Sequence, residues 1–443
     1  MTEGRGLLAP ATLMSDTGTF GNNDELRFRV RRFLEENPRP TGRQLADAGL
    51  VAPHLPAPWG VGAGPADQLI IDEELRAAGV SRPVNPIGIG WAGPTIVYAG
   101  TPEQQERWMP RLLSGDDFWC QLFSEPNAGS DLASLQTRAV RDGDEWVVNG
   151  QKVWTSGGHV ADMGMLIART DPDVPKHQGI TWFAFDMHQG SSVDVRPLRE
   201  MTGRALFNEV FLSDARVGDD AIIGGTNNGW AVANTTLMFE RAGLGAGGHS
   251  AAALATPGTV AGDLDKRVGD FARSAGPSGA GGAMAAGMVS LLRRLSKQNG
   301  LDRDPVFRQD LVKLHTLHEV GRMLALRVKA EKAAGRDIPA APNIAKLSMS
   351  EIMRKSRDLG LRCVGAAGTL HAYDAEGRRE LEAATGEPAL PFITELALFA
   401  QGPPIYGGTD QVQRNILGER VLGLPKEPND DRVKSWAELP RNG

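Results

Sequence analysis

The sequence has little of what marks several protein classes. Its 443 residues include only two cysteines, Cys120 and Cys363, which lie far apart and form no pattern with spaced histidines. Neither a disulfide framework nor a zinc site is predicted, no other metal site is expected, and both thiols should be reduced and buried. The chain also lacks a run of about 18 apolar residues and a basic N-terminal stretch followed by an apolar segment and a cleavage site. We therefore expect no membrane association and a cytoplasmic location.

An excess of positive charge is also absent. The formal net charge is −6 at pH 7, and the lysines and arginines do not gather along one face, so no nucleic-acid partner is predicted. The composition, 41% hydrophobic and 23% charged, is that of an ordinary globular protein. The length allows two or three domains around a large core.

Residues 1–118 carry a helical rhythm. Between residues 24 and 36 the apolar residues Leu26 and Val30 recur at helical spacing among mixed charges. Residues 101–113 open with Thr101 as a cap and a proline at the first helical position, which predicts a second helix. This region is therefore interpreted as an N-terminal helical domain.

Residues 119–225 change to short β-rich runs, such as 145–148. Two turn pairs among them, Asp142-Gly143 and Asn149-Gly150, are strong hairpin signals. We predict a compact antiparallel β domain inserted between helical regions.

The helical rhythm returns over residues 226–425 and predicts a C-terminal helical bundle. An Ala/Gly-rich stretch at 251–288 interrupts it, either as a poorly packed connection or as a further helix. Residues 426–443 have the composition of a polar tail. The predicted fold class is α+β.

The most informative segment is residues 122–131 (LFSEPNAGSD), which enters the β domain as a tight turn carrying Ser124 and Ser130. Backbone amides and hydroxyls in such a loop can hold a planar heterocycle and a polar chain. Taken alone, however, a segment of this kind is more often a capped surface turn.

The segment does not stand alone, because the run from Trp119 through Trp154-Thr155-Ser156 resembles the flavin-binding signature of the acyl-CoA dehydrogenase family. The resemblance extends to residues 93–95, Pro110, 208–210 and 405–414. It implies an N-terminal helical domain, a central antiparallel β domain and a C-terminal four-helix bundle. It also implies FAD between the β domain and the C-terminal helices.

By this resemblance, Ser124 should bind the pyrimidine side of the flavin, and Trp154 and Thr155 should lie beside the ring near its reactive nitrogen. Ser130 should face the pantetheine arm of CoA. A tryptophan in a strand is otherwise more often a core residue. The full set of cofactor residues implied is Leu122, Ser124, Ser130, Trp154, Thr155, Ser156, Thr409 and Gln411.

The segment 407–409 (GGT) leads into a predicted helix over residues 410–422. Free amides and the Thr409 hydroxyl at the positive end of a helix could take a pyrophosphate, although an ordinary capped helix is an equal alternative. In relatives, the residues matching Thr409 and Gln411 bind the FAD of a neighbouring subunit. The resemblance is less close at Arg303, Phe307 and His315, where the family has further FAD contacts of this kind.

Acyl-CoA dehydrogenation needs a base that removes the proton α to the thioester, and a carboxylate in a water-poor pocket suits this task. The commonest family position for that glutamate is occupied here by Gly407, which cannot act as a base. The Gly407 N–H could still donate to the thioester oxygen as enolate charge builds up.

A minority of the family, including isovaleryl-CoA dehydrogenase, places the glutamate on the first long C-terminal helix directly before an arginine. Here Glu240 and Arg241 stand at that point. At about 100° per residue they should flank an apolar stripe. The residues of that stripe are Trp230, Ala233, Leu237 and Leu244.

We therefore predict Glu240 as the catalytic base and Arg241 as a residue that shapes the substrate pocket. The alternative for Glu240 is a half-exposed carboxylate with a salt-bridge partner. A base at 240 would approach the α carbon from a different wall of the pocket than one at 407. A further hypothesis is that this leaves room for a branched or bulky acyl group.

The resemblance implies an acyl-CoA substrate, a trans-2-enoyl-CoA product and an electron-transfer flavoprotein as acceptor. The departures from the common family pattern resemble actinobacterial members, some of which act on steroid side chains and assemble as tetramers of two different subunits. A homo-oligomer or such a heterotetramer is expected. The alternatives are a non-catalytic or half-site subunit, and a flavin oxidase or monooxygenase on the same fold.

Overall fold

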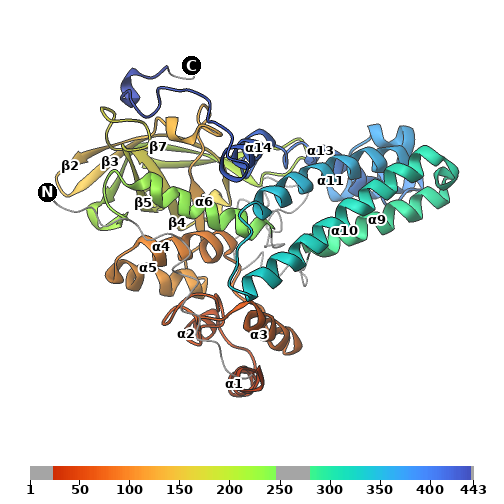
Figure 1. The fold of residues 1–443 in the computed structure, drawn as a ribbon, viewed down its shortest axis with the longest axis horizontal. Coiled ribbons are helices and arrows are strands. Elements are labelled where there is room, and N and C mark those ends of the chain that lie inside the picture. The colour runs from red at the N-terminus through yellow and green to blue at the C-terminus, as the bar shows by residue number, and fades with distance from the viewer. Residues whose placement is uncertain (1–22, 246–279, 441–443) are drawn as a thin grey trace.

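The computed structural model describes residues 23–245 and 280–440. The chain begins with a cluster of helices, which lies below the sheet in Figure 1. These helices are α1 (Asn23–Glu36), α2 (Gly42–Asp47), α3 (Pro65–Ala77), α4 (Gly93–Ala99) and α5 (Pro102–Ser114), with a π-helical turn at Gly88–Ala92 before α4.

Local sequence signals explain where two of these helices lie. In α1, the apolar residues Leu26, Val30 and Leu34 are buried at helical spacing. In α5, the Thr101 side chain accepts a hydrogen bond from the Gln104 N–H, and the helix ends at a glycine with φ of 80°. Both predicted helices are confirmed.

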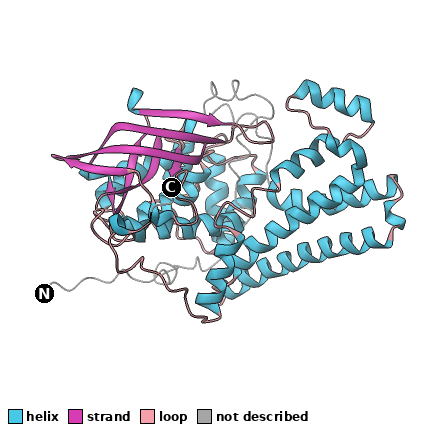
Figure 2. Ribbon diagram, turned by 90° about the horizontal axis from the view of Figure 1, so that it is seen from above, coloured by secondary structure: helices cyan, strands magenta, loops and turns pink. Residues whose placement is uncertain are grey.

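The middle of the chain forms one eight-stranded sheet, which Figure 2 shows beside the helices. Its main path runs β6-β7-β3-β2-β4-β5-β8, and β1 pairs with β4. Most pairs are antiparallel, whereas β1 and β2 each run parallel to β4. The strands are β1 (Trp119–Leu122), β2 (Arg138–Asp142), β3 (Glu145–Ser156), β4 (Met163–Arg169), β5 (Ile180–Asp186), β6 (Val193–Leu198), β7 (Phe207–Gly218) and β8 (Ile222–Ile223).

One of the two hairpin predictions is confirmed and the other is wrong. Asp142 pairs with Glu145 across a tight turn that joins β2 to β3. The Asn149-Gly150 pair instead lies inside β3, where the register with β7 shifts. The glycine is needed there because a Cβ on Gly150 would come within 2.3 Å of the Thr137 hydroxyl oxygen. The signal therefore marks a bulge and a close approach between segments rather than a turn.

The remaining helices begin with α6 and continue into a bundle that extends away from the sheet (Figure 1). They are α6 (Gly229–Gly245), α9 (Ala280–Gln298), α10 (Pro305–Ala333), α11 (Ala341–Val364), α12 (Ala375–Thr385), α13 (Leu390–Phe399) and α14 (Asp410–Ile416). Most of the Ala/Gly-rich stretch at 251–288 lies outside the described residues, and α9 begins within its last part. None of the helices that the structure describes is long and apolar enough to cross a membrane.

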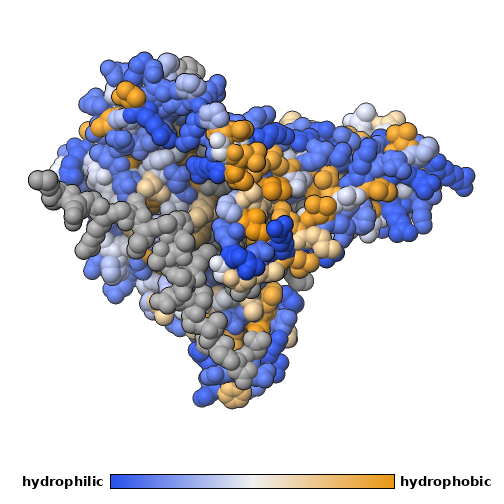
Figure 3. Space-filling view, viewed as in Figure 1, coloured by the Kyte–Doolittle hydropathy of each residue, from blue (hydrophilic) through white to orange (hydrophobic). Residues whose placement is uncertain are grey.

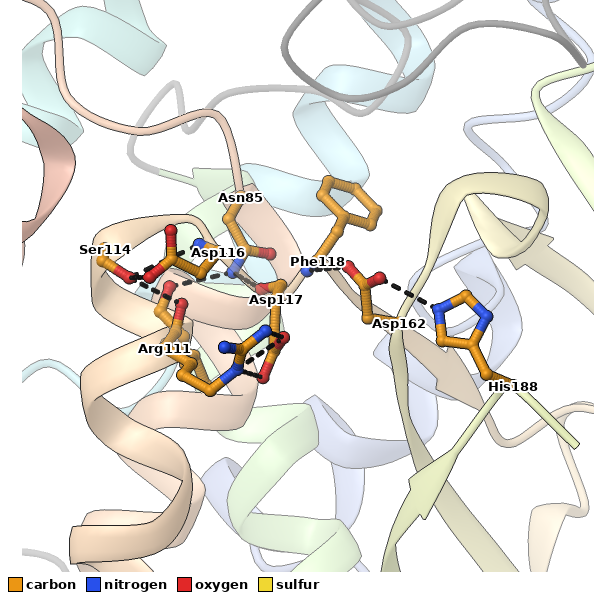
Figure 4. Close-up of polar contacts among 9 residues, drawn as sticks. Asn85, Arg111, Ser114, Asp116, Asp117, Phe118, Asp162 and His188 are labelled. Atoms are coloured by element: carbon orange, nitrogen blue, oxygen red, sulfur yellow. Dashed lines mark hydrogen bonds and ion pairs between the residues drawn. The ribbon is translucent and has the colours of Figure 1, made fainter.

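A buried amide joins the N-terminal helices to the sheet (Figure 4). The Asn85 side chain, 1% exposed, donates to the carbonyls of Leu112 and Asp117 and accepts from the N–H groups of Gly88 and Trp119. Three of these bonds fix the end of α5, the loop that follows it and the first residue of β1 to one point, and the fourth holds the π-helical turn. The start of β1 is thereby set by the helices that precede it.

Candidate active site

The two segments with the flavin-binding resemblance meet in space. Leu122 is the last residue of β1 and is fully buried. Two residues later, the Ser124 carbonyl accepts a hydrogen bond of 2.9 Å from the Val153 N–H of β3. Ser124 is thereby held next to Trp154 and Thr155, although 29 or more residues separate them in the sequence.

Trp154 has an unusual backbone and an exposed ring. Its φ is 62°, in the left-handed region that bulky residues rarely adopt, and it sits where the β3–β7 register shifts. The indole is 57% exposed and makes an edge-to-face contact with Phe207 at 5.8 Å between ring centroids. The core role that a strand tryptophan usually has is therefore excluded.

Thr155 supplies a buried hydroxyl beside this exposed ring. Among the described residues, its Oγ1 has no hydrogen-bond partner, although the atom is buried. Its carbonyl accepts from Asn208 Nδ2 at 2.9 Å, which fixes the residue. Ser156, partly buried, ends β3 opposite Phe207. Because an unpaired buried polar group is costly, the Thr155 hydroxyl fits a site for an external acceptor or donor.

A buried ion pair supports this part of the site. Lys152, fully buried, lies 2.8 Å from Glu125 and donates to the Phe123 carbonyl at 3.1 Å. The Glu125 carboxylate also accepts from the N–H groups of Gln136 and Thr137. Burial alone would raise the pKa of Glu125, but Lys152 and these N–H donors outweigh it and hold that pKa below its ordinary value.

The rest of the 122–131 loop is open to solvent at Ser130, which is exposed. The adjacent Asp131 is 2.9 Å from the Lys176 ammonium. The exposed serine therefore lies next to a residue with a fixed side chain. This arrangement fits a binding role for the Ser130 hydroxyl at the surface.

Glu240 is more buried than the sequence suggested. Its exposed fraction is 9%, and it lies on the buried face of α6 itself, whereas Trp230 and Leu237 of the predicted stripe are only partly buried. The residues of the observed face are Gly229, Val232, Ala233, Thr236 and Glu240. The prediction that Glu240 flanks the buried stripe was wrong, because the face includes polar residues that an apolar pattern does not count. The side chains of Arg241 and Leu244 lie outside the described residues.

A hydrogen bond links Glu240 to the sheet. Gln121 Nε2, in β1, is 3.3 Å from Glu240 Oε2. Gln121 directly precedes Leu122, so this bond places the carboxylate beside the strand that leads into the flavin-like loop. Glu240, Leu122 and Ser124 are thus brought together around the end of β1.

The C-terminal motif forms a separate part of the site. Gly407 and Gly408 have φ of 62° and 80°, and their carbonyls accept from Gln413 Nε2 at 3.0 and 3.3 Å. A glutamate at 407 would have to adopt this left-handed backbone. Thr409 caps α14 by accepting from the Val412 N–H, as predicted, and Gln411 is exposed in the first turn of α14.

Buried polar side chains on α11 hold this motif. Asn343 donates to Gln413 Oε1 at 2.6 Å, and Lys346 bonds the Pro403 carbonyl and lies 3.6 Å from Asp410. Within the described chain, the side-chain hydrogen bonds of α14 run to α11 and to its own preceding turn. The structure therefore does not join Thr409 and Gln411 to Trp154 and Thr155 by hydrogen bonds.

Comparison with known proteins agrees with this architecture. Family models match the N-terminal, middle and C-terminal domains of acyl-CoA dehydrogenases at residues 23–116, 120–215 and 270–422. The chain is 34% identical over 400 residues to the acyl-CoA dehydrogenase IpdE1 of Mycobacterium tuberculosis, covering 90% of this chain and 91% of that protein.

The chain belongs to the acyl-CoA dehydrogenase family.

It is also 40% identical over 382 residues to the acyl-CoA dehydrogenase FadE34 of Mycobacterium tuberculosis. This alignment covers 86% of the chain but only 46% of FadE34, so the chain spans about half the length of that relative. Among solved structures, the Tcur3481-Tcur3483 steroid ACAD is similar at 25% identity with a TM-score of 0.66, covering 95% of this chain and 100% of that chain. The predicted acyl-CoA dehydrogenase fold is confirmed, and members of this family bind FAD.

Several residues that support the candidate site were not predicted as such. Gln121 and the buried pair of Glu125 and Lys152 hold predicted site residues in place. Asn208, which the resemblance included without a role, does the same for Thr155. A polar residue inside the apolar run Trp119–Leu122 was a usable signal for Gln121. Phe307, matched to a family FAD contact across subunits, is instead fully buried in the core of the bundle.

Proposed function

We propose that this acyl-CoA dehydrogenase removes hydrogens from the α and β carbons of an acyl-CoA thioester in an FAD-dependent reaction, with Glu240 as the base. The observation that carries the proposal is the carboxylate of Glu240, 9% exposed on α6 and hydrogen-bonded to Gln121 of β1. A carboxylate shielded from water beside the cofactor loop suits abstraction of a weakly acidic proton. Gln121 would help to orient the carboxylate toward the α carbon.

The residues around β3 fit FAD. The Thr155 hydroxyl is buried without a partner among the described residues, and the exposed Trp154 ring stands next to it. We propose that Thr155 and Ser156 bind the edge of the ring system, with Trp154 against it and Ser124 and Leu122 at its pyrimidine side. Bound FAD would supply the acceptor for the hydride that leaves the β carbon.

The remaining site residues are proposed to hold the thioester and the nucleotide parts. The Gly407 N–H would donate to the thioester oxygen, and Gln413 holds the turn that aims it. Ser130 would bind the pantetheine arm or the cofactor, and Thr409 and Gln411 would bind FAD, in this subunit or its neighbour. Arg241 would line the substrate pocket.

Bulky acyl groups are the proposed substrates. Gly407 adds no side chain where most of the family has a glutamate, and a similar solved structure is named a steroid ACAD. We therefore expect branched or steroid side-chain thioesters to be turned over faster than straight medium-chain ones. Faster turnover of the straight chains would contradict this choice of substrate.

The test is anaerobic flavin bleaching by the purified chain. Acyl-CoAs with straight, branched and steroid chains are added to the parent, to Glu240→Gln and to the matched control Glu36→Gln, an exposed residue at the end of α1. We expect the bleaching rate to fall about 10²- to 10⁴-fold in Glu240→Gln, the range for loss of a general base, and not to change in the control. Equal bleaching in all three would show that the base lies elsewhere.

Two alternatives have distinct outcomes in the same preparation. If the chain alone binds no flavin but binds it together with a related subunit, it is a half-site subunit. The burial of Phe307, which matches a family FAD contact across subunits, would agree with that outcome. Rapid oxygen consumption without another acceptor would indicate an oxidase or monooxygenase. Transfer of the electrons to an electron-transfer flavoprotein is expected for the dehydrogenase.

A further inference from the structure

We propose that residues 430–437 act as a C-terminal clasp that holds residues 127–134, the second half of the 122–131 cofactor loop and the turn that follows it, in their binding position through Lys176 and Arg169. The clasp deepens the proposed function, since it rests on this loop being a ligand-binding element. Asp431 and Trp436 are then positioning residues rather than catalytic ones. In Figure 1 the C-terminal segment lies against the sheet, far from the bundle that precedes it.

The first contact runs through Lys176, whose side chain is 6% exposed. Its ammonium lies 2.7 Å from Asp431 of the clasp and 2.9 Å from Asp131 of the loop, so one buried cation joins the two segments. Asp131 also accepts from Ser134, and it directly follows Ser130. Burial by itself would lower the pKa of Lys176, but the hydrogen bonds to Asp131 and Asp431 outweigh it and raise that pKa, so the ammonium remains charged at neutral pH.

The second contact runs through Arg169 at the end of β4. This guanidinium, 3% exposed, donates to the carbonyls of Ala133 and Lys176 at 2.5 and 2.6 Å. The Trp436 ring covers it, with 4.9 Å between the guanidinium carbon and the ring centroid. A cation held over an indole and shielded from water gains stability, so Trp436 stabilises the arginine that holds Ala133.

The clasp is seated by its backbone as well. The Trp436 N–H donates to the Val174 carbonyl at 2.9 Å, and the Ala437 N–H donates to the Pro172 carbonyl at 3.0 Å. The segment that receives these bonds also contains His177, whose ring lies 5.0 Å from that of Trp230 at the start of α6. The clasp therefore reaches Asp131 and Ala133 only through Lys176 and Arg169, and the segment that it binds also contacts the start of the helix that carries Glu240.

The contacts are specific to one side of the segment. Lys434, between Asp431 and Trp436, pairs with Asp430 in a solvent-exposed bridge, with side chains 53% and 62% exposed. Such a bridge contributes little. The inward and outward residues of the same short segment thus provide a test variant and a matched control.

The experiment compares the full chain with Asp431→Asn, Trp436→Ala, the double variant, and the control Lys434→Gln. Binding of FAD and of coenzyme A is measured by calorimetry, and hydrogen exchange is followed in peptides covering 127–134. We expect exchange in this loop to rise and the Kd of at least one probe to increase about 3- to 10-fold in the double variant, with the control unchanged. Asp431→Glu, which keeps the charge, should restore most of both properties.

The two readouts separate failure of the clasp from failure of the proposed function. Faster exchange in 172–176 with unchanged exchange in 127–134 would overturn the clasp, whether or not a ligand binds. Parent protein that binds neither probe would contradict the proposed function, while the exchange of the loop would still decide on the clasp. Unchanged Kd values for both probes, despite faster loop exchange, would reject its role in binding.

Discussion

At the scale of single residues, the site depends on polar groups placed where water is scarce. Lys152 is fully buried in β3, where the neighbouring Val148 and Val153 are apolar, and it is tolerated because Glu125 and a carbonyl satisfy it. Glu125 directly follows Ser124 and Lys152 directly precedes Val153, and the Ser124 carbonyl accepts from the Val153 N–H. The ion pair therefore helps to hold the 122–131 loop on β3.

Replacement of Lys152 by methionine should therefore destabilise the protein. The change leaves Glu125 buried without its cation, and we expect the free energy of unfolding in urea at pH 7 to fall by about 3 kcal/mol. Lys313→Met, which removes an exposed pair on α10, is the control and should have little effect. The double change Lys152→Met with Glu125→Gln should recover part of the loss. A loss in the double variant as large as in the single one would contradict the pairing.

The same pair predicts a pH dependence. The pKa of Glu125 is lower in the folded than in the unfolded protein, so its stabilising contribution is complete above the unfolded pKa of about 4.3. The contribution is lost as the pH falls through the depressed folded pKa. The stability of the parent relative to the double variant should thus decrease only below about pH 4.

At the scale of elements, the connections between helices and sheet determine where the site residues stand. The Asn85 side chain (Figure 4) joins the end of α5 to the start of β1 through hydrogen bonds to the backbone of Leu112, Asp117 and Trp119, and it also accepts from the Gly88 N–H. On the other side of Phe118, Asp162 accepts from the Phe118 N–H and from the exposed His188. The placement of β1 in turn brings the Gln121 side chain within hydrogen-bond distance of Glu240.

Asn85→Leu, of similar volume, should remove the four bonds without leaving a cavity. Because buried N–H and carbonyl groups would lose their partners, we expect the free energy of unfolding to fall by roughly 3 kcal/mol. His188→Ala, whose ring is 69% exposed in its bridge to Asp162, is the control, with an effect below about 0.5 kcal/mol. Thermal or urea unfolding followed by circular dichroism measures both. Equal effects would show that the junction does not depend on Asn85.

Elements with local signals were the ones that the sequence predicted well. The caps of α5 and α14 and the β2–β3 turn need only a few neighbouring residues, so they could be found from the pattern. The bulge at Asn149-Gly150 could not, because its cause is Thr137, a contact distant in the sequence. The predicted orientation of Glu240 on α6 was wrong for a related reason. Thr236 faces inward because it contacts α4, and Glu240 faces inward because it contacts β1. Hydrophobic periodicity does not report such polar contacts.

The spatial grouping of the predicted site residues could be foreseen in part for the same reason. The motifs around 122–131 and 154–156 carry their residues in short runs, and the structure joins them by one backbone bond. Supporting residues such as Gln121 and Lys176 act across long sequence separations. No pattern within the chain links Lys176 to Asp431, so the docking of residues 430–437 could not be predicted from their polar composition.

At the scale of the whole molecule, one face carries an unusual amount of apolar surface. Figure 3 shows it across the middle of the view, in the region of α10, α11 and α14. The exposed apolar residues on α10 are Val306, Val312, Val320, Met323 and Leu326. Apolar patches of this kind are typical of contacts between subunits.

We therefore expect the chain to be an oligomer, either with itself or with a related subunit, through α10. Light scattering after size-exclusion chromatography should give a mass above that of one chain, and Met323→Glu with Leu326→Glu should shift it toward the monomer. A pair of changes at solvent-facing charged residues of α10, Lys313→Glu and Arg322→Glu, is the control for added negative charge. A monomeric parent that stays monomeric with a related subunit would contradict the expectation.

The bond between Thr95 of α4 and Thr236 of α6 has a consequence for how the protein is made. The two hydroxyl oxygens are 3.0 Å apart and fully buried, and 141 residues of chain separate them. Since the ribosome delivers the chain from its N-terminus, α4 emerges long before its partner. The face of α4 that contacts α6 therefore stays uncovered while the whole sheet is synthesised. It can be covered only after the helix that carries Glu240 has been made. Completion of the N-terminal helical part and placement of the proposed base are therefore coupled, and both must follow synthesis of α6.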